Sequence, residues 1–296
     1  MSQCSLHIYP RYDEPGNALA SRLDCDVSII DLHKFPDGES RIKVGHVTET
    51  VLVYISLDHP NEKLIDLIFA AHAMREAGAK RLVLVCPYIC YMRQDKAFRQ
   101  GEAVSQKIVG QLLARYFDRI VTVDPHLHRV KSLDAVFEGI ETTVLSAMHL
   151  IAEKTASDEK LDGALLVGPD SESRQWLEKA SKKMGAPFLI AEKERRGDRE
   201  VIITLDGVEQ ASARPVVIID DVISSGSTIR RCAQLLREAG AGHIDAMTVH
   251  ALCSRADMNL MKAAGVARIQ SCDGVLHETN TISLAPLIAG ALESEI

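Results

Sequence analysis

The chain has 296 residues, of which 46% are hydrophobic and 25% charged, and its formal net charge is −7 at pH 7. This length accommodates two domains of ordinary size, and the composition is that of a globular protein. The negative charge argues against nucleic acid or an anionic membrane surface as the main partner, so any anion site must be local.

The N-terminus has no basic-then-apolar signal peptide, and no segment reaches the 18 or so apolar residues that a membrane span needs. We therefore expect a cytoplasmic protein without a membrane partner. Seven cysteines at irregular spacing are typical of reduced thiols rather than of a disulfide framework.

Residues 1–45 are predicted to be short and turn-rich, and a Pro-Asp-Gly turn at 36–38 joins two extended pieces. A strand at 51–56 follows, and then a helix over about 61–77 with apolar residues at helical spacing. Gly78 ends that helix.

A second apolar strand is predicted at 81–88, and charges abruptly follow it. Arg93, Lys96 and Arg99 make the next loop either a solvated connector or an anion-binding loop, because ligands of α/β proteins collect at carboxyl strand ends. A helix over 103–116 and a strand that ends in Asp124 and His126 come next.

From about 140 to 163 the chain is expected to be helical and then polar, with a domain boundary near 145. Strands are predicted at 164–170 and 186–193, and a basic loop at 193–199 leads into another extended segment. We predict domains at 1–145 and 146–280, with a C-terminal helix at 281–296 that packs back on the first. Short connections between alternating strands and helices indicate an α/β class with mainly parallel sheets flanked by helices, and an internal duplication is plausible.

The stretch 216–228, VVIIDDVISSGST, combines an apolar strand, two acids, a run of small residues and the start of an amphipathic helix. Small residues before a helix N-terminus let a phosphate approach the backbone amides closely. Asp220 and Asp221 suit a neutral or metal-bound group, because two carboxylates would repel a bare second phosphate. Adjacent sugar hydroxyls meet this requirement, so the pattern favours a phosphorylated pentose. The alternatives are a Walker-B-like acidic strand end or an ordinary Ser/Thr-capped turn; the chain has no GxxxxGK[ST] motif.

His126 and Asp170 each follow an apolar strand, where a polar strand cap is the simpler interpretation of either residue alone. A carboxylate with few other protein ligands is also how Mg²⁺ is commonly held, since the ion takes further oxygens from water and substrate phosphates. Histidine is an unusual direct ligand of Mg²⁺, so His126 would act through water or on a phosphate oxygen.

Six motifs occur in one order along the chain: KFPDGES, YMRQDKAFRQGEAVS, VDPH, GPD, EKERRGD and IIDDVISSGST. Their order and separations resemble those of the ribose-phosphate diphosphokinases, or phosphoribosyl diphosphate (PRPP) synthetases, over nearly the whole chain. The run GEAVS is similar to the archaeal-type branch. The resemblance implies two phosphoribosyltransferase-like domains, an ATP side and a ribose 5-phosphate side. It also implies transfer of the diphosphoryl group of Mg²⁺-ATP to ribose 5-phosphate, giving PRPP and AMP for nucleotide biosynthesis.

The resemblance implies roles residue by residue. Phe35, Asp37 and Glu39 would bind adenine from a neighbouring subunit. Arg93, Gln94 and Asp95 would hold the nucleotide, while His126 and Asp170 would serve Mg²⁺-ATP. Asp220 and Asp221 would take the ribose hydroxyls. The 5-phosphate would be bound by Ser224, Ser225, Gly226, Ser227 and Thr228. Lys193 and Arg195 would stabilise charge on the transferring group, and a homodimer or larger homo-oligomer is expected.

Two other functions compete with the synthetase. A phosphoribosyltransferase would share residues 216–228 but would not need the RQDK and basic-loop motifs, and a non-catalytic regulatory paralogue would be expected to lack part of the metal and basic-loop set. The chain departs from the family pattern at Ser171–Ser173, which includes Glu172, and at Ser227, where a glycine is usual.

Overall fold

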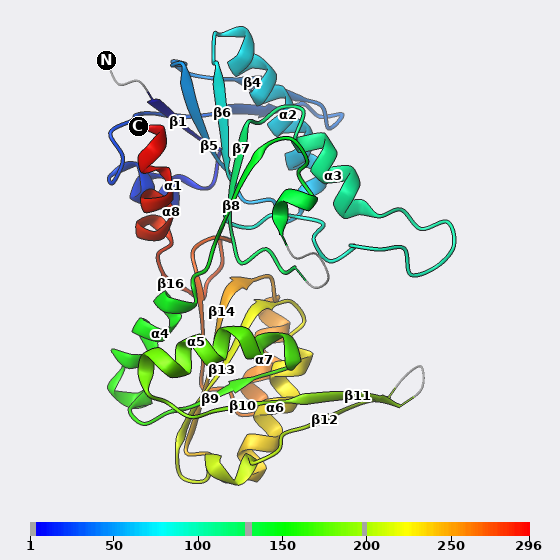
Figure 1. The fold of residues 1–296 in the computed structure, drawn as a ribbon, viewed down its shortest axis with the longest axis vertical. Coiled ribbons are helices and arrows are strands. Elements are labelled where there is room, and N and C mark those ends of the chain that lie inside the picture. Colours follow the sequence, from blue (N-terminus) through cyan, green and yellow to red (C-terminus); the bar gives the residue numbers. More distant parts are fainter. Residues whose placement is uncertain (1–3, 128–131, 197–199) are drawn as a thin grey trace. The chain divides into compact units, whose positions relative to one another are not determined.

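The computed structural model describes residues 4–127, 132–196 and 200–296 (Figure 1). The chain forms two compact units, one of Met1–Leu145 with Ser283–Ile296 and one of Ser146–Ile282. Each unit is an α/β layer structure, as the alternation of strands and helices predicted.

The first unit contains a six-stranded parallel sheet in the order β2-β1-β5-β6-β7-β8. Its strands are β1 (Cys4–Ile8), β2 (Asp26–Ile29), β5 (Thr50–Tyr54), β6 (Arg81–Val85), β7 (Arg119–Val123) and β8 (Glu141–Leu145). The antiparallel hairpin of β3 (Asp31–Lys34) and β4 (Ser40–Lys43) stands apart from it. Its helices are α1 (Asp13–Ala20), α2 (Pro60–Glu76), α3 (Ser105–Leu113) and α8 (Ala285–Leu292), with 3-10 turns at Leu133–Ala135 and Glu293–Glu295.

The second unit has its own six-stranded parallel sheet, in the order β10-β9-β13-β14-β15-β16. Its strands are β9 (Leu165–Gly168), β10 (Phe188–Ile190), β13 (Pro215–Ile223), β14 (His243–Ala251), β15 (Arg268–Cys272) and β16 (Asn280–Ile282). A second antiparallel hairpin is formed by β11 (Glu192–Arg196) and β12 (Glu200–Thr204). The helices are α4 (Met148–Ala156), α5 (Arg174–Met184), α6 (Ser227–Glu238) and α7 (Arg255–Ala263), with 3-10 turns at Glu159–Leu161, Ser171–Ser173 and Val208–Ala211.

The two units share one topology. In each, the first two strands pair in reversed order, a hairpin comes next along the chain, and the four remaining strands extend the sheet in sequence. The plausible internal duplication therefore has a structural counterpart in strand order. The hairpins β3–β4 and β11–β12 occupy equivalent places in the two repeats.

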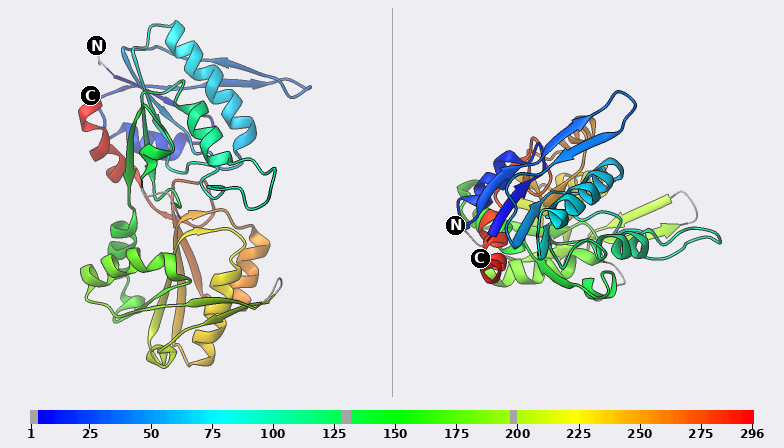
Figure 2. Two further views of the ribbon diagram at one scale, coloured as in Figure 1. Left: turned by 45° about the vertical axis from the view of Figure 1, so that its right-hand side comes forward. Right: turned by 90° about the horizontal axis from the view of Figure 1, so that it is seen from above.

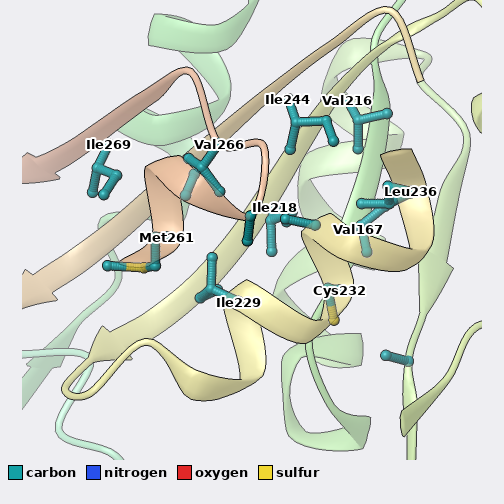
Figure 3. Packing of buried hydrophobic residues seen from close by; sticks show 14 of the residues in the cluster. Val167, Val216, Ile218, Ile229, Cys232, Leu236, Ile244, Met261, Val266 and Ile269 are labelled. Carbon is teal, nitrogen blue, oxygen red and sulfur yellow. The ribbon is translucent and has the colours of Figure 1, made fainter. Parts of the chain in front are cut away.

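Helices cover both faces of each sheet (Figure 2). In the first unit α1 contacts α8 on one face, and α2 and α3 lie on the other; in the second unit α4 pairs with α5 and α6 with α7. In the second unit, the apolar face of α6 packs on the sheet through Ile229, Cys232 and Leu236 (Figure 3). Burial of Ile229 and of Leu236 contributes about 1.5–3 kcal/mol each relative to solvent exposure, which holds α6 against β13.

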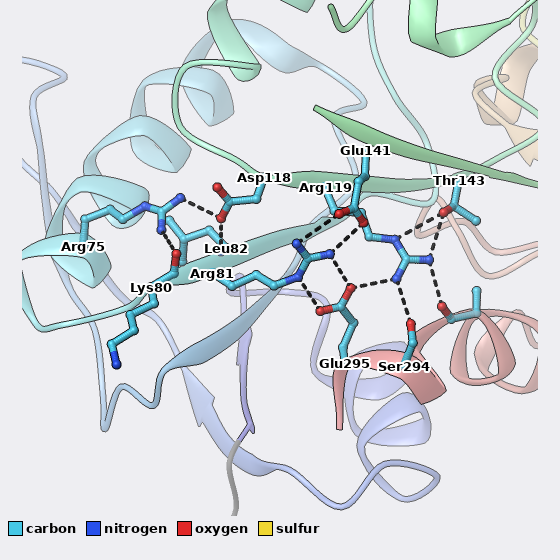
Figure 4. A network of polar contacts seen from close by, with 11 residues as sticks. Arg75, Lys80, Arg81, Leu82, Asp118, Arg119, Glu141, Thr143, Ser294 and Glu295 are labelled. Carbon is cyan, nitrogen blue, oxygen red and sulfur yellow. Dashed lines mark hydrogen bonds and ion pairs between the residues drawn. The ribbon is translucent and has the colours of Figure 1, made fainter. Parts of the chain in front are cut away.

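The last residues of the chain complete the first unit through a polar network (Figure 4). Glu295 forms ion pairs with Arg81 of β6 at 2.6 Å and with Arg119 of β7 at 2.8 Å. Arg119 and Glu295 are each 9% exposed. Arg119 also donates to Thr143 Oγ1 of β8, so three adjacent strands are tied to the C-terminal turn.

Two expectations about local structure need correction. Residues 141–145 were expected to be helical but form the strand β8 at the edge of the sheet. The turn-rich N-terminal region contains more regular structure than predicted, because Cys4–Ile8 is a wholly buried strand inside the first sheet. Among the described residues, every helix is too short or too polar to cross a bilayer.

Candidate active site

Asp220 and Asp221 lie within β13, which continues to Ile223, whereas the sequence placed them where the strand ends. Neighbouring residues in a strand project to opposite faces. Asp221 is 2% exposed, and its carbonyl accepts a hydrogen bond from Thr248 Oγ1 at 3.0 Å. Asp220 is only partly buried, and its Oδ1 accepts from the Asp221 N–H at 3.0 Å. Asp220 is therefore the more accessible of the two carboxylates.

Negative charge is concentrated around Asp220. Burial, and then the charges of Asp221 and Asp170, raise the pKa of Asp220 well above its usual range. Asp170 comes from the end of β9, the strand that pairs with β13 in the same sheet. Within the described part of the chain, neither Asp170 nor Asp220 has an ion-pair partner, so the two carboxylates provide a place where a cation would be stabilised.

Asp170 also has a structural role. Its Oδ1 accepts hydrogen bonds from the N–H of Glu172 at 3.0 Å and of Ser173 at 3.4 Å, which caps the 3-10 turn before α5. One of its oxygens thus caps the 3-10 turn that follows β9, rather than the strand itself. Oδ2 accepts no hydrogen bond from the described residues and remains available to a ligand. Glu172, which departs from the family pattern, is exposed.

The loop between β13 and α6 has the features of an anion site. Gly226, at the N-cap of α6, has φ 63°, a left-handed conformation that favours glycine. A Cβ at this position would lie 2.4 Å from Sδ of Met261 in α7. No side chain caps α6, so its first backbone N–H groups are left for solvent or a ligand. The remaining predicted residues line this turn: Ser224, Ser225 and Ser227 are exposed and Thr228 is half-buried.

The adenine-binding prediction falls on the tip of the β3–β4 hairpin. The Gly38 N–H donates to Phe35 O at 3.0 Å, and the Phe35 N–H donates to Glu39 O at 2.8 Å, which closes the predicted turn. Asp37 Oδ1 accepts from the Glu39 N–H at 3.1 Å. Phe35 is 42% exposed and contacts His33 edge-on at 4.7 Å between ring centroids. An exposed aromatic ring at a hairpin tip provides a stacking surface.

Arg93, Gln94 and Asp95 lie in an irregular loop between β6 and α3. The Gln94 carbonyl accepts from the Gln106 N–H of α3 at 3.3 Å, which anchors the loop to the helix. The Arg93 side chain is exposed and makes no hydrogen bond within the described residues. A guanidinium in this state is available to an anionic ligand.

His126 follows β7, the strand beside β6. Asp124 and His126 both have positive φ angles, 38° and 47°, and the His126 N–H donates to Asp124 O at 2.9 Å. Non-glycine residues with positive φ are uncommon, and they cluster at functional sites. The half-buried His126 thus lies on the same edge of the sheet as the loop that carries Arg93.

Lys193 and Arg195 lie on β11, opposite Ile203 and Val201 of β12. The sequence predicted a basic loop over 193–199, but residues 193–196 belong to the strand β11, which pairs with β12. The side chains of Lys193 and Arg195 are outside the described residues. Residues 197–199 of the same predicted loop are also outside them.

The predicted residues therefore form two groups, one in each unit. Asp170, Asp220, Asp221 and residues 224–228 gather at the carboxyl ends of β9 and β13 in the second unit. The first unit carries the hairpin tip, the Arg93 loop and His126. In the described part of the chain, no three His, Cys, Asp or Glu side chains are grouped to hold a metal by themselves.

Comparisons with known proteins match both parts of the chain to families. The family described as the N-terminal domain of ribose phosphate pyrophosphokinase matches residues 11–116, and the phosphoribosyl transferase domain matches residues 139–285. A ribose-phosphate pyrophosphokinase of Methanopyrus kandleri is 31% identical over 94% of this chain and 95% of its own. Its counterpart in Methanobrevibacter smithii is 33% identical over 93% and 95%, respectively. Ribose-phosphate pyrophosphokinase 2 of Archaeoglobus fulgidus is 34% identical over 93% and 97%. The crystal structure of phosphoribosylpyrophosphate synthetase from Mycobacterium smegmatis has the same fold, with a TM-score of 0.83 over 99% of both chains at 24% identity.

Proposed function

Because the chain belongs to the ribose-phosphate pyrophosphokinase family, we propose that it transfers the diphosphoryl group of ATP to ribose 5-phosphate. The anomeric hydroxyl oxygen forms a bond to the β-phosphorus, and the bond from that phosphorus to the bridging α,β-oxygen breaks. The hydroxyl proton is released, and the products are PRPP and AMP. Family membership confirms the resemblance found in the motifs.

The observation that carries the proposal is the grouping of Asp220 with the uncapped start of α6. The 5-phosphate would accept hydrogen bonds from the N–H groups around Gly226 and from the surrounding serine and threonine hydroxyls. Asp220 and Asp221 would accept hydrogen bonds from the ribose hydroxyls. This arrangement orients the anomeric hydroxyl, and orientation supplies much of the catalysis in phosphoryl-type transfer.

The nucleotide would be bound by the first-unit group. Arg93 would contact phosphate oxygens, Gln94 and Asp95 would hold the nucleotide, and Phe35 would stack on adenine beside Asp37 and Glu39. A homo-oligomer in which this hairpin serves a neighbouring subunit's site is part of the proposal. Lys193 and Arg195 would stabilise the charge on the transferring group, because cations aimed at developing charge are the main catalytic device available for this chemistry.

The donor set fits magnesium that arrives with the nucleotide. Mg²⁺ prefers oxygen ligands, keeps several waters and needs only one or two carboxylates from the protein. Asp170, with Oδ2 available beside Asp220, meets that requirement, and His126 would act through water or on a phosphate oxygen. When bound, the ion would neutralise phosphate charge.

The test is a chromatographic assay with ATP, Mg²⁺ and ribose 5-phosphate, each omitted in turn. AMP and PRPP should appear together and only in the complete mixture. Consumption of PRPP when a purine or pyrimidine base is added, without AMP formation from ATP, would instead identify a phosphoribosyltransferase. Nucleotide binding without turnover would identify a regulatory paralogue.

Lys193→Ala should lower turnover by about two to three decades, the usual effect of losing one preorganised transition-state contact. Lys182→Ala, at an exposed lysine on α5, is the matched control and should keep normal turnover. Equal activity in both variants would remove Lys193 from the mechanism.

A further inference from the structure

The first sheet has a topological switch point between β1 and β5. These strands are parallel neighbours, but β1 leads through α1 to β2 on one side, whereas β5 leads through α2 to β6 on the other. The loops that follow them therefore leave the edge of the sheet in opposite directions. In open α/β sheets, ligands bind in the crevice that such a divergence creates at the carboxyl ends of the strands.

A cavity of about 590 Å³ occupies this crevice. Tyr9 and Arg11 line it from the loop after β1, and His59 to Lys63 from the start of α2. Lys34 lines it from the end of β3, next to the tip of the β3–β4 hairpin. The volume lies within the range of small-molecule sites. None of these lining residues is among those assigned to ATP or ribose 5-phosphate above.

The charges in the cavity favour an anion. Lys34 pairs with Asp66 at 3.1 Å and more distantly with Glu62, the acidic residue of the lining, while Lys63 pairs with Asp58 at 2.7 Å. The side chains of Arg11 and His59 make no hydrogen bond or ion pair within the described residues. Arg11 is thus an uncompensated cation at this site, in a chain whose net charge is −7.

Both of these residues are held in a left-handed backbone conformation, with φ 79° at Arg11 and 48° at His59. This conformation costs about 1–2 kcal/mol for a residue with a side chain. Such strain concentrates at binding and active sites.

The second unit has a ligand site at the equivalent position. Its switch point lies between β9 and β13, the strands followed by Asp170 and by the loop of residues 224–228. Arg11 lies three residues after β1, close to the place that Asp170 takes two residues after β9. His59, the N-cap of α2, is the counterpart of Gly226, the N-cap of α6, and both have a left-handed backbone. This correspondence rests on the proposed ribose 5-phosphate site, whereas the cavity and its charges do not.

We propose that the crevice binds a phosphorylated small molecule, whose phosphate is held by Arg11 and His59. Two contacts connect it to the predicted nucleotide-binding segments. Asn61 in the lining accepts a hydrogen bond from Tyr91, two residues before Arg93, and Lys34 adjoins Phe35. Occupancy of the crevice would therefore act on the ATP-binding elements of the same unit.

The test uses nuclear magnetic resonance of protein labelled with ¹³C at histidine Cε1. The His59 signal is identified by its loss in His59→Asn, and inorganic phosphate is titrated against sodium chloride at matched ionic strength. The signal should move saturably with phosphate. Arg11→Gln should weaken that response about tenfold or more, because one charge-assisted contact is lost. Arg11→Lys should restore part of it. These substitutions leave the cost of the left-handed backbone at position 11 unchanged, because arginine, glutamine and lysine all carry a Cβ.

Arg22→Gln, at an exposed arginine just after α1, is the matched control and should respond like the unmodified protein. Parallel titrations with ribose 5-phosphate and AMP separate a sugar phosphate from a nucleotide as the source of the phosphate. A His59 signal that ignores phosphate, or that moves equally in Arg11→Gln, would overturn the proposal. The readout needs no turnover, so PRPP formation without a His59 response would reject this site and leave the proposed function intact.

Discussion

Replacing Glu295 by glutamine removes a buried negative charge that two arginines share (Figure 4). Oε2 accepts from Arg81 Nε at 2.6 Å, and Oε1 accepts from Arg81 Nη2 and Arg119 Nη1, each at 2.8 Å. Breaking a buried ion pair by removing one partner costs about 3–5 kcal/mol. Arg81 retains Glu141, and its side chain is 32% exposed, so its charge stays partly solvated. We therefore expect the free energy of unfolding of the first unit to fall by about 2–3 kcal/mol.

The pH dependence provides a second check on Glu295. Arg81 and then Arg119 hold the pKa of its carboxyl below the ordinary value of 4.5. The ion pairs therefore stabilise the folded first unit fully above pH 4.5, and this stabilisation is lost as the pH falls through the lower pKa of the folded state. The difference between the unmodified protein and Glu295→Gln should be constant near neutral pH and shrink in acid.

Urea unfolding followed by far-ultraviolet circular dichroism measures the effect. Trp176 is the only tryptophan and belongs to the second unit, so its fluorescence reports that unit separately. Glu293→Gln, at an exposed residue of the same turn, is the matched control. Equal unfolding free energies for the two variants would refute the assignment of stability to this network.

Three further outcomes are expected. Gly226→Ala should cost about 1–2 kcal/mol of stability because of its left-handed backbone, and it should raise KM for ribose 5-phosphate because Met261 must move; an unchanged KM would contradict the phosphate-loop assignment. Asp220→Asn should raise Tm at neutral pH while lowering turnover. The raised pKa means that the folded state binds the proton more tightly than the unfolded state, so stability falls as pH rises from the ordinary value of 3.8 through the higher folded value. Equal Tm values for Asp220→Asn and the unmodified protein in thermal denaturation across a pH series would refute this. Phe35→Ala should raise KM for ATP. If the hairpin serves the neighbouring subunit of a symmetric dimer, co-expression of Phe35→Ala with Lys193→Ala should restore up to about a quarter of normal activity. Activity no greater than that of the two variants alone would place the hairpin in its own subunit's site.

The parallel α/β class followed from the sequence because most central strands are apolar runs bounded by helices. The buried face of α6, with Ile229, Cys232 and Leu236, likewise obeys the helical period. Both signals are local, so they can be recognised without knowledge of the fold.

Among the strands that escaped prediction, β1 and β8 show the physical reasons. In β1, Ser5 and His7 interrupt the apolar run, yet both are buried. Their hydrogen-bond partners, Thr48 and the carbonyl of His46, lie about forty residues along the chain. Such distant partners cannot be recognised in one sequence. In contrast, β8 is an edge strand with mixed exposure, so it lacks the continuous apolar pattern of a central strand.

The sequence allowed the candidate site residues to be named, but it did not show which of them lie close together. Asp170 and Asp220 are fifty positions apart, and only the pairing of β9 with β13 explains why the charge of Asp170 raises the pKa of Asp220. The crevice lined by Arg11 and His59 carries no sequence motif. Its only sequence signal is that both residues follow predicted or actual strands, a property shared by many loop residues.

The first unit is formed by two separate stretches of the chain, so it can be completed only at the end of protein synthesis. Residues 283–296 leave the ribosome after the whole of the second unit, yet Glu295 is 214 positions from its partner Arg81. Until then, Arg119 in the nascent chain lacks the carboxylate that neutralises it in the finished protein. The N-terminal unit is therefore translated first and completed last, whereas Ser146–Ile282 is already a continuous folding unit.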